Sequence, residues 1–241
     1  MEVAFADEGV LLRERGIRMP IVVLNADEGS FDLMVAHRLE PEIYNFRSLA
    51  FFSKAVERVG EESYPIHIKL DTGMHRLGFM EGELDMLTET LGETPSVKVA
   101  TIFSHLNCSD MPQEDRYTRE QIARFDRMSG RLAAALPYPV LRHTANSAAI
   151  ERFPEAQFDM CRLGLGLYGF GFEHNDELKP VSTLKSRIVQ LKHLSAGEAV
   201  GYGRAGKLTR DSVTATVPMG YADGLDRHPV SYTHLRAHET S

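Results

Sequence analysis

The sequence predicts an α/β fold, in which helices cover a parallel sheet and a smaller β-rich domain follows. Two observations predict it. Short apolar, β-branched runs alternate with amphipathic segments through the first 177 residues, and the alternation stops at "ELKP" (177–180). Repeated strand–helix–strand units form parallel sheets through right-handed crossovers. With this many units, a (β/α)8 barrel is the leading form and an open doubly wound sheet is the alternative.

Six runs have the composition of strands, because they are short, apolar and bounded by turn residues. The later part of the chain, at 181–203 and 212–224, has the composition of strands joined by turns without helices. We therefore expect one domain at 1–177 and the start of a second, β-rich domain at 178–229. The six strand candidates of the first domain lie at 21–24, 42–46, 65–70, 97–105, 139–144 and 158–170.

Two helices are clear between these strands. In segment 82–91 three leucines recur at helical spacing, and Gly92 stands where a helix would stop. In segment 118–135 apolar residues again recur at helical spacing, after a predicted capping box formed by Thr118 and Gln121. These segments supply the amphipathic faces that a parallel sheet needs on its outer side.

Composition limits the function classes. The chain has 241 residues, 43% of them hydrophobic, and a net charge of −7 without a basic cluster, so a nucleic-acid partner is not expected. No apolar run approaches the roughly 20 residues of a membrane span, and the first residues lack a secretory signal. Cys108 and Cys161 are too few for a disulfide framework. We expect a cytoplasmic protein with a small-molecule partner.

Polar residues follow four consecutive predicted strands. In a parallel barrel the active site lies at the carboxyl ends of the strands, so these residues are site candidates. Each has a structural alternative: an Asp71–Arg76 loop ion pair, buried histidines with satisfied hydrogen bonds, a helix cap at Ser147, and a glycine needed only for packing. The candidates are Lys69, Arg76, His105, His143, Asn146, Ser147, Arg162 and Gly164.

The last two strand ends suggest a phosphate site. Barrels commonly bind phosphate with the loops after strands 7 and 8. Ser147 precedes the apolar "AAI" and could offer its hydroxyl and a helix N-terminus to an anion, while Gly164 lets backbone N–H groups approach.

Four motifs carry a family resemblance. "KLDTGMHRLGF" (69–79), "HTANSAAI" (143–150), "RLGLGLYG" (162–169) and "VPMGYADG" (217–224) occur in this order. Together they resemble the alanine racemase family, pyridoxal-phosphate enzymes with a barrel and a β domain, over about residues 3–228. The resemblance implies a homodimer that interconverts L-alanine and D-alanine and supplies D-alanine for peptidoglycan. Serine or another small amino acid stays open as the substrate.

The resemblance also implies how the cofactor is held. Ser147 and the N–H groups near Gly164 and Leu165 would bind its phosphate, with Asn146 beside them. Arg76 would contact the phenolic oxygen of the ring.

A second group of residues would act at the ring nitrogen. Arg162 would face that nitrogen and form a hydrogen-bonded chain with His105 and His143. Because a guanidinium keeps its proton, the ring would be a weaker electron sink. Lys69 matches a family lysine that can be carbamylated beside the arginine of its motif. Leu163 stands where the family usually has proline.

The implied chemistry needs two bases, a lysine and a tyrosine. Tyr221 matches the tyrosine, which acts in trans across a dimer interface; His105 would help it lose its proton, and Arg76 completes the catalytic set. The family lysine lies in a first-strand motif ending "AYGHG", which is absent from this sequence. We therefore expect a fragment, inactive alone, with an incomplete (β/α)8 TIM-type barrel followed by the start of the β-rich C-terminal domain.

The segment "VSYTHLRAHET" (230–240) resembles a translated sequencing adapter, so 230–241 is interpreted as a non-native tail. A metal site of His234, His238 and Glu239 is rejected for this reason, and no metal is expected. Two alternatives stay open: a non-catalytic pyridoxal-phosphate carrier built on a single barrel, with a role in cofactor homeostasis, and an inert fragment.

Overall fold

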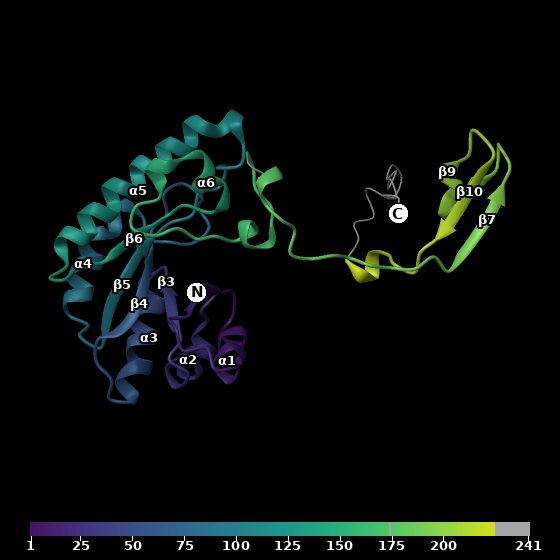
Figure 1. Cartoon of the computed structure of the whole chain (residues 1–241). Coiled ribbons are helices and arrows are strands. Elements are labelled where there is room, and N and C mark those ends of the chain that lie inside the picture. Colours follow the sequence, from purple (N-terminus) through teal and green to yellow (C-terminus); the bar gives the residue numbers. More distant parts are fainter. Residues whose placement is uncertain (174, 225–241) are drawn as a thin grey trace. The chain divides into compact units, whose positions relative to one another are not determined.

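The structure is a computed structural model that describes residues 1–173 and 175–224 (Figure 1). The chain divides into two compact units, Met1–Val181 and Ser182–Ser241. The predicted tail at 230–241, with its rejected metal site, lies outside the described residues. No helix in the described part of the chain is both long enough and apolar enough to cross a membrane.

The first unit contains one parallel sheet whose strands lie side by side in sequence order. An unbroken order is that of a barrel, whereas a doubly wound sheet reverses its order at a switch point. The prediction of an incomplete α/β barrel is therefore confirmed. The strands are β1 (Glu2–Val3), β2 (Val22–Val23), β3 (Glu40–Ile43), β4 (Tyr64–Lys69), β5 (Val97–Phe103) and β6 (Leu141–His143).

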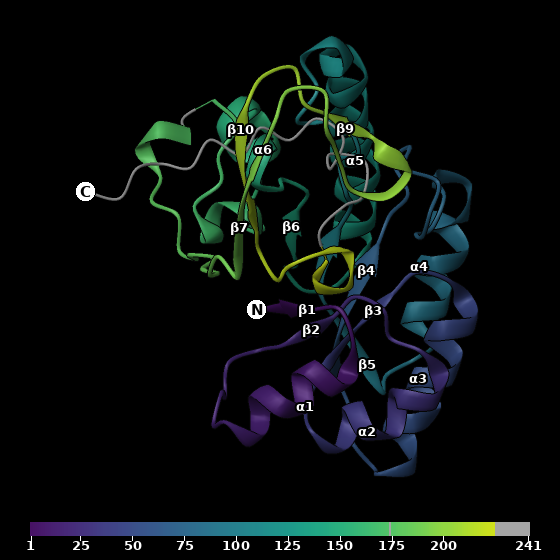
Figure 2. The same ribbon diagram turned by 90° about the vertical axis from the view of Figure 1, so that its right-hand side faces the viewer.

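Helices connect consecutive strands of this sheet, as Figure 2 shows from the side. Helix α4 ends at Gly92, the predicted stop. Helix α5 begins earlier than predicted, so the capping box of Thr118 and Gln121 is wrong. A 3-10 turn at Pro112–Glu114 leads directly into α5 and starts it instead. The helices are α1 (Ala6–Glu14), α2 (Phe31–Ala36), α3 (Phe46–Arg58), α4 (Leu84–Gly92), α5 (Asp115–Ala135) and α6 (Ser147–Arg152).

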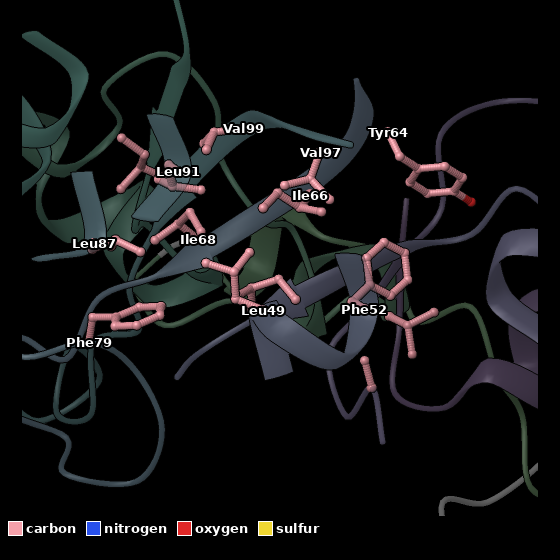
Figure 3. Close-up of a cluster of buried hydrophobic side chains, with 14 of the residues drawn as sticks. Leu49, Phe52, Tyr64, Ile66, Ile68, Phe79, Leu87, Leu91, Val97 and Val99 are labelled. Atoms are coloured by element: carbon pink, nitrogen blue, oxygen red, sulfur yellow. The ribbon is translucent and has the colours of Figure 1, made fainter. Parts of the chain in front are cut away.

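An apolar core fills the space between the sheet and these helices (Figure 3). Ile66 and Ile68 of β4 pack there with Leu49 and Phe52 of α3 and Leu87 of α4. Because alternate residues of a strand point to opposite faces, His67 and Lys69 face the other side of the sheet. That inner face carries the polar side chains of the site.

The pairing of β4 with β5 shifts register once. Ile66 lies opposite Val99. The next residue, His67, lies opposite Thr101, so Ala100 has no partner. An extra residue in one strand reverses its alternation, and Thr101 therefore joins His67 on the inner face.

The predicted strand at 158–170 is wrong. This segment has no regular strand, and it ends in a 3-10 turn at Leu165–Tyr168. Two isolated backbone bonds attach it to the end of the sheet, from Asp159 N–H to the Arg142 carbonyl at 3.0 Å and from Arg162 N–H to the Ala145 carbonyl at 2.9 Å. Repeated glycines favour turns over an extended ladder here.

The second unit is built from short antiparallel pairs. Strand β7 (Gln190–Leu194) pairs with β10 (Ser212–Thr216), and β8 (Ala199–Val200) pairs with β9 (Gly206–Lys207). A 3-10 turn at Tyr221–Asp223 follows β10. The described residues of this unit contain strands and 3-10 turns but no α-helix.

Candidate functional site

Arg162 lies at the centre of the candidate site, in the segment after α6. Its Nη1 donates to His143 Nδ1 at 2.7 Å. Its Nη2 donates to the Ser104 carbonyl at 2.7 Å and to His105 Nδ1 at 3.2 Å. The side chain is 11% exposed. The structure thus brings Arg162, from a segment without regular strand structure, together with His105 and His143 at the ends of β5 and β6.

Burial makes both histidines neutral acceptors. Burial, with the charges of Arg162 and His67, lowers the pKa of His143 to about 2. Burial, with the charges of Arg162, Lys69 and Arg76, lowers the pKa of His105 to about 4. The pKa of Arg162 is also lowered by burial, but arginine still keeps its proton in proteins. Arg162 Nε also lies 3.6 Å from Glu2 Oε2. The centre is therefore one cation held by two uncharged imidazole rings and a carboxylate.

The hydrogen bonds continue beyond His143 along the inner face of the sheet. His143 Nε2 lies 3.0 Å from Thr101 Oγ1, and that oxygen lies 2.8 Å from His67 Nδ1. His67 Nε2 in turn lies 2.8 Å from Glu40 Oε2. One continuous chain therefore joins the end of β6 to the start of β3.

Ser147 and two glycines form a second cluster. Ser147 Oγ accepts the N–H of Gly164 at 3.0 Å and the N–H of Gly166 at 3.2 Å. A Cβ at Gly166 would lie 2.5 Å from Cδ1 of Leu163, whereas a Cβ at Gly164 would make only an ordinary contact, 3.9 Å from Ser147 Oγ. Two converging N–H groups and a hydroxyl suit an anion. Sequence analysis missed Gly166, although it repeats the spacing of Gly164.

Asn146, not Ser147, caps helix α6. Its Oδ1 accepts the N–H of Ala149 at 3.0 Å and the hydroxyl of Ser109 at 2.8 Å. The helix-cap interpretation of Ser147 is therefore wrong, and its hydroxyl remains with the glycines. Leu165 begins the 3-10 turn, and its side chain is exposed.

The loop after β4 closes on itself. Asp71 Oδ1 accepts the N–H groups of Gly73 at 2.8 Å and His75 at 3.1 Å. The structural alternative of an Asp71–Arg76 ion pair is wrong, because Asp71 pairs with His75 at 3.3 Å. Arg76 is exposed, and no described residue forms a hydrogen bond or ion pair with it. It is a cation available to a ligand.

Lys69 is buried and paired. Its Nζ lies 2.7 Å from Glu42 Oε1, with side chains 8% and 0% exposed. Burial, opposed by the charge and hydrogen bond of Lys69, raises the pKa of Glu42. Nothing in the structure tests carbamylation of Lys69, which stays a prediction.

Tyr221 belongs to the second unit, where its side chain is 71% exposed. The strand ends belong to the first unit, so the role of Tyr221 beside them stays a prediction. Within the described residues, no group of three His, Cys, Asp or Glu side chains is arranged to hold a metal ion.

Sequence analysis assigned no role to Glu40, Glu42, His67 or Thr101. A signal existed for three of them, because acids and a histidine alternating with apolar residues inside a strand indicate a polar inner face. Thr101 had no such signal, since its orientation depends on the unpaired Ala100.

The fold and the site define an incomplete α/β barrel that carries a hydroxyl and two backbone N–H groups together beyond its strand ends. The family model "Alanine racemase, N-terminal domain" matches residues 1–171, and "Alanine racemase, C-terminal domain" matches 181–240. The chain therefore belongs to the alanine racemase family. The second match includes most of the segment interpreted as a tail.

Curated relatives agree with this assignment. An alanine racemase of Sorangium cellulosum is 36% identical over 231 residues, covering 93% of this chain and 61% of the relative. One of Clostridium novyi is 36% identical over 235 residues, with 94% and 60% covered. The chain thus spans about 60% of the length of these relatives.

Solved structures show the same likeness. Alanine racemase from Streptomyces coelicolor has a TM-score of 0.86 and 28% identity, with 94% of this chain and 63% of that chain covered. Alanine racemase from Bartonella henselae, with covalently bound pyridoxal phosphate, has a TM-score of 0.76 and 25% identity, with 94% and 62% covered.

Proposed function

We propose that the complete protein is a pyridoxal-phosphate-dependent racemase that interconverts L-alanine and D-alanine. The observation that carries the proposal is the joint placement of two clusters by one segment. Residues 162–166 supply Arg162 to the two histidines and two backbone N–H groups to Ser147. A phosphate and an aromatic nitrogen on one ligand suit these two clusters.

The residues present fit this cofactor. The phosphate would accept hydrogen bonds from the hydroxyl of Ser147 and from the N–H groups of Gly164 and Gly166, which now bond to one another. Leu165, between the two glycines, would adjoin the phosphate. Arg162 would donate to the ring nitrogen, and Arg76 would meet the phenolic oxygen. Asn146 would act by fixing the start of α6, which carries Ser147.

Bound pyridoxal phosphate makes the Cα–H of an amino acid acidic by withdrawing electrons. Arg162 holds its own proton, so it limits that withdrawal and favours fast return of the proton to Cα. His143 and His105, both neutral, hold the guanidinium without taking its charge. Arg76 orients the ring.

Racemisation needs one base on each face of Cα. Tyr221 serves one face, acting across a homodimer interface with His105 beside it. A lysine of the "AYGHG" motif, absent from this sequence, serves the other. The enzyme works in the cytoplasm and supplies D-alanine for peptidoglycan. Lys69 is proposed as a carbamylation site.

A non-catalytic carrier built on one barrel is the weaker proposal. It accounts for the cluster at Ser147 but gives no reason for a second unit of antiparallel strands. The match of 181–240 to the C-terminal domain of the racemases favours the enzyme.

The test is an assay of the complete reading frame, purified with pyridoxal phosphate and given L-alanine or D-alanine separately. We expect each enantiomer to yield the other, as followed by chiral chromatography. Cofactor binding without conversion would favour the carrier. The 241-residue chain, assayed in parallel, is expected to show no conversion above free pyridoxal phosphate, because it has no "AYGHG" lysine. Conversion by this chain would show that another lysine serves as the base.

A further inference from the structure

His67 and Thr101 are buried, and the side chain of Glu40 beside them is 13% exposed. These three residues have no part in the proposed function, yet they continue the hydrogen bonds of Arg162 across the sheet. We propose that they are positioning residues, and that the chain they form fixes which atom donates and which accepts in each hydrogen bond between Arg162 and Glu40. The inference deepens the proposed function and rests on it only for the role of Arg162 at the ring nitrogen.

The two ends of the chain permit one direction. A guanidinium only donates hydrogen bonds, and an ionised carboxylate only accepts them. Arg162 therefore donates to His143 Nδ1, which must carry a lone pair. At the other end Glu40 accepts from His67 Nε2, which must carry a proton. Both ends require the same sense of donation, from Arg162 toward Glu40.

Thr101 connects the two histidines with a single hydroxyl proton. A neutral His143 with a lone pair on Nδ1 has its proton on Nε2, and it donates this proton to Thr101 Oγ1 at 3.0 Å. The hydroxyl then donates to His67 Nδ1 at 2.8 Å. If His67 were doubly protonated, the hydroxyl would receive two protons, and its own would lack an acceptor among the described residues. Both rings are therefore neutral Nε2–H tautomers.

Burial makes this order stringent. His67, Thr101 and His143 are 4%, 5% and 1% exposed. A buried polar group that lacks its hydrogen-bond partner cannot bond to water instead, and this destabilises the folded chain. Each reversed bond would leave such a group, so it is disfavoured. The ring of His143 is also fixed, because it stacks on Phe103 with centroids 5.1 Å apart and planes at 2°. The extra residue Ala100 in β5 is what turns Thr101 inward.

The chain has a consequence for Arg162. Because Nδ1 of His143 always accepts, it holds the guanidinium of Arg162 in one orientation. It does so without removing a proton from the guanidinium. The far end, Glu40, borders a cavity of about 310 Å3 lined also by Arg18 and Arg38. The orientation of Arg162 is thus set by residues at the opposite end of the strands as well as by its bond to the Ser104 carbonyl and its ion pair with Glu2.

The first test measures the ring 15N resonances of the unliganded chain labelled at histidine, assigned by single substitutions. We expect His67 and His143 each to show a protonated Nε2 and an unprotonated Nδ1. An Nδ1–H tautomer or an imidazolium at either ring would overturn the proposal. The measurement needs no cofactor and no activity, so its failure is distinct from failure of the proposed function.

The second test measures whether the hydroxyl of Thr101 makes the tautomer of His67 depend on that of His143. Gln accepts or donates, so Glu40→Gln removes the constraint at one end only. In this variant we expect His67 to remain an Nε2–H tautomer, because Arg162 still sets the direction through Thr101. In Glu40→Gln/Thr101→Val, which lacks the hydroxyl, we expect His67 to populate both tautomers.

Glu40→Gln/Thr101→Ser is the matched control, since it keeps a hydroxyl, and it should restore the single tautomer of His67. Equal tautomer mixtures in all three variants would show that Thr101 transmits nothing and would overturn the relay. If the valine variant does not fold, a mixture of His67 tautomers in Glu40→Gln and in the serine variant would still overturn the relay, and a single Nε2–H tautomer in both would support it.

Discussion

The ammonium of Lys69 lies 2.7 Å from Oε1 of Glu42, and both side chains are buried on the inner face of the sheet. They come from adjacent parallel strands, β3 and β4. Removing one partner of a buried ion pair leaves an uncompensated charge, which costs far more than the pair itself contributes. The two residues therefore behave as a unit, and any change to Lys69 is felt by Glu42.

Glu42→Gln should increase carbamylation of Lys69, because the negative carbamate would no longer lie beside a carboxylate. The substitution should also lower the free energy of unfolding by about 3 kcal/mol, since an ammonium is left buried without its counter-charge. The measurements are the 13C carbamate resonance in labelled bicarbonate and urea denaturation. Lys69→Gln has no amine at this position to carbamylate, so it gives the background of the carbamate signal. Equal carbamate occupancy in the variant and the wild type would contradict the prediction.

A polar residue that follows an apolar strand lies at the carboxyl-end edge of a parallel barrel, so His105 and His143 could be grouped before their contacts were seen. Arg162 joins them although its own segment forms no regular strand, and its contact with both histidines was implied by the family resemblance. Ser147 followed from the same logic. Its partner Gly166 lay unnoticed inside the segment taken for a strand.

The inner-face chain could not be predicted from local pattern. Whether Thr101 faces the helices or the barrel interior depends on the unpaired Ala100, and that irregularity arises from pairing between distant strands. The segment 158–170 failed for a related reason. Its apolar residues suit a strand, but its glycines and its few bonds to the sheet leave it as an irregular loop.

Gly78→Ala should destabilise the first unit. Gly78 has φ +131°, and a Cβ there would lie 2.6 Å from the backbone nitrogen of Asp71. The strained conformation alone costs roughly 1–3 kcal/mol, and the backbone contact adds to it. Gly82→Ala is the matched control, because a Cβ at Gly82 meets nothing within 4 Å and its φ is not positive. Urea midpoints that fall equally for both variants would refute the local explanation.

Stability should fall as the pH falls below about 6.5, the ordinary pKa of histidine in an unfolded chain. In the folded chain the pKa is lowered to about 4 for His105 and about 2 for His143. Between these values the unfolded chain binds more protons, so the free energy of unfolding decreases with falling pH, by at most about 1.4 kcal/mol per pH unit for each histidine.

The measurement is urea denaturation at several pH values between 7 and 4.5. His105→Gln keeps an acceptor for Arg162 but cannot titrate. The decrease in the free energy of unfolding with falling pH should therefore become smaller by the contribution of one histidine. His193→Gln, at an exposed position in the second unit, should leave it unchanged. An unchanged slope in His105→Gln would remove His105 from this account.

Ser147→Ala should weaken binding of pyridoxal phosphate by roughly 1–3 kcal/mol, the loss expected for one hydrogen bond to a charged group. The hydroxyl oxygen accepts the N–H groups of Gly164 and Gly166 at 3.0 and 3.2 Å, so in the proposed site its own proton would be donated to the phosphate. Helix α6 should be unaffected, because Asn146 and not Ser147 caps it.

Comparison of two ligands separates this role from a general loss of structure. Pyridoxal has the ring of pyridoxal phosphate but no phosphate, so its affinity should be nearly the same for Ser147→Ala and the wild type. Pyridoxal phosphate alone should bind more weakly to the variant, as measured by equilibrium dialysis of both ligands under one condition. If both ligands lose affinity equally, Ser147 supports the fold of the site and does not contact the phosphate. If neither does, the anion cluster at Gly164 and Gly166 acts without the hydroxyl, and the phosphate must be held by backbone N–H groups alone.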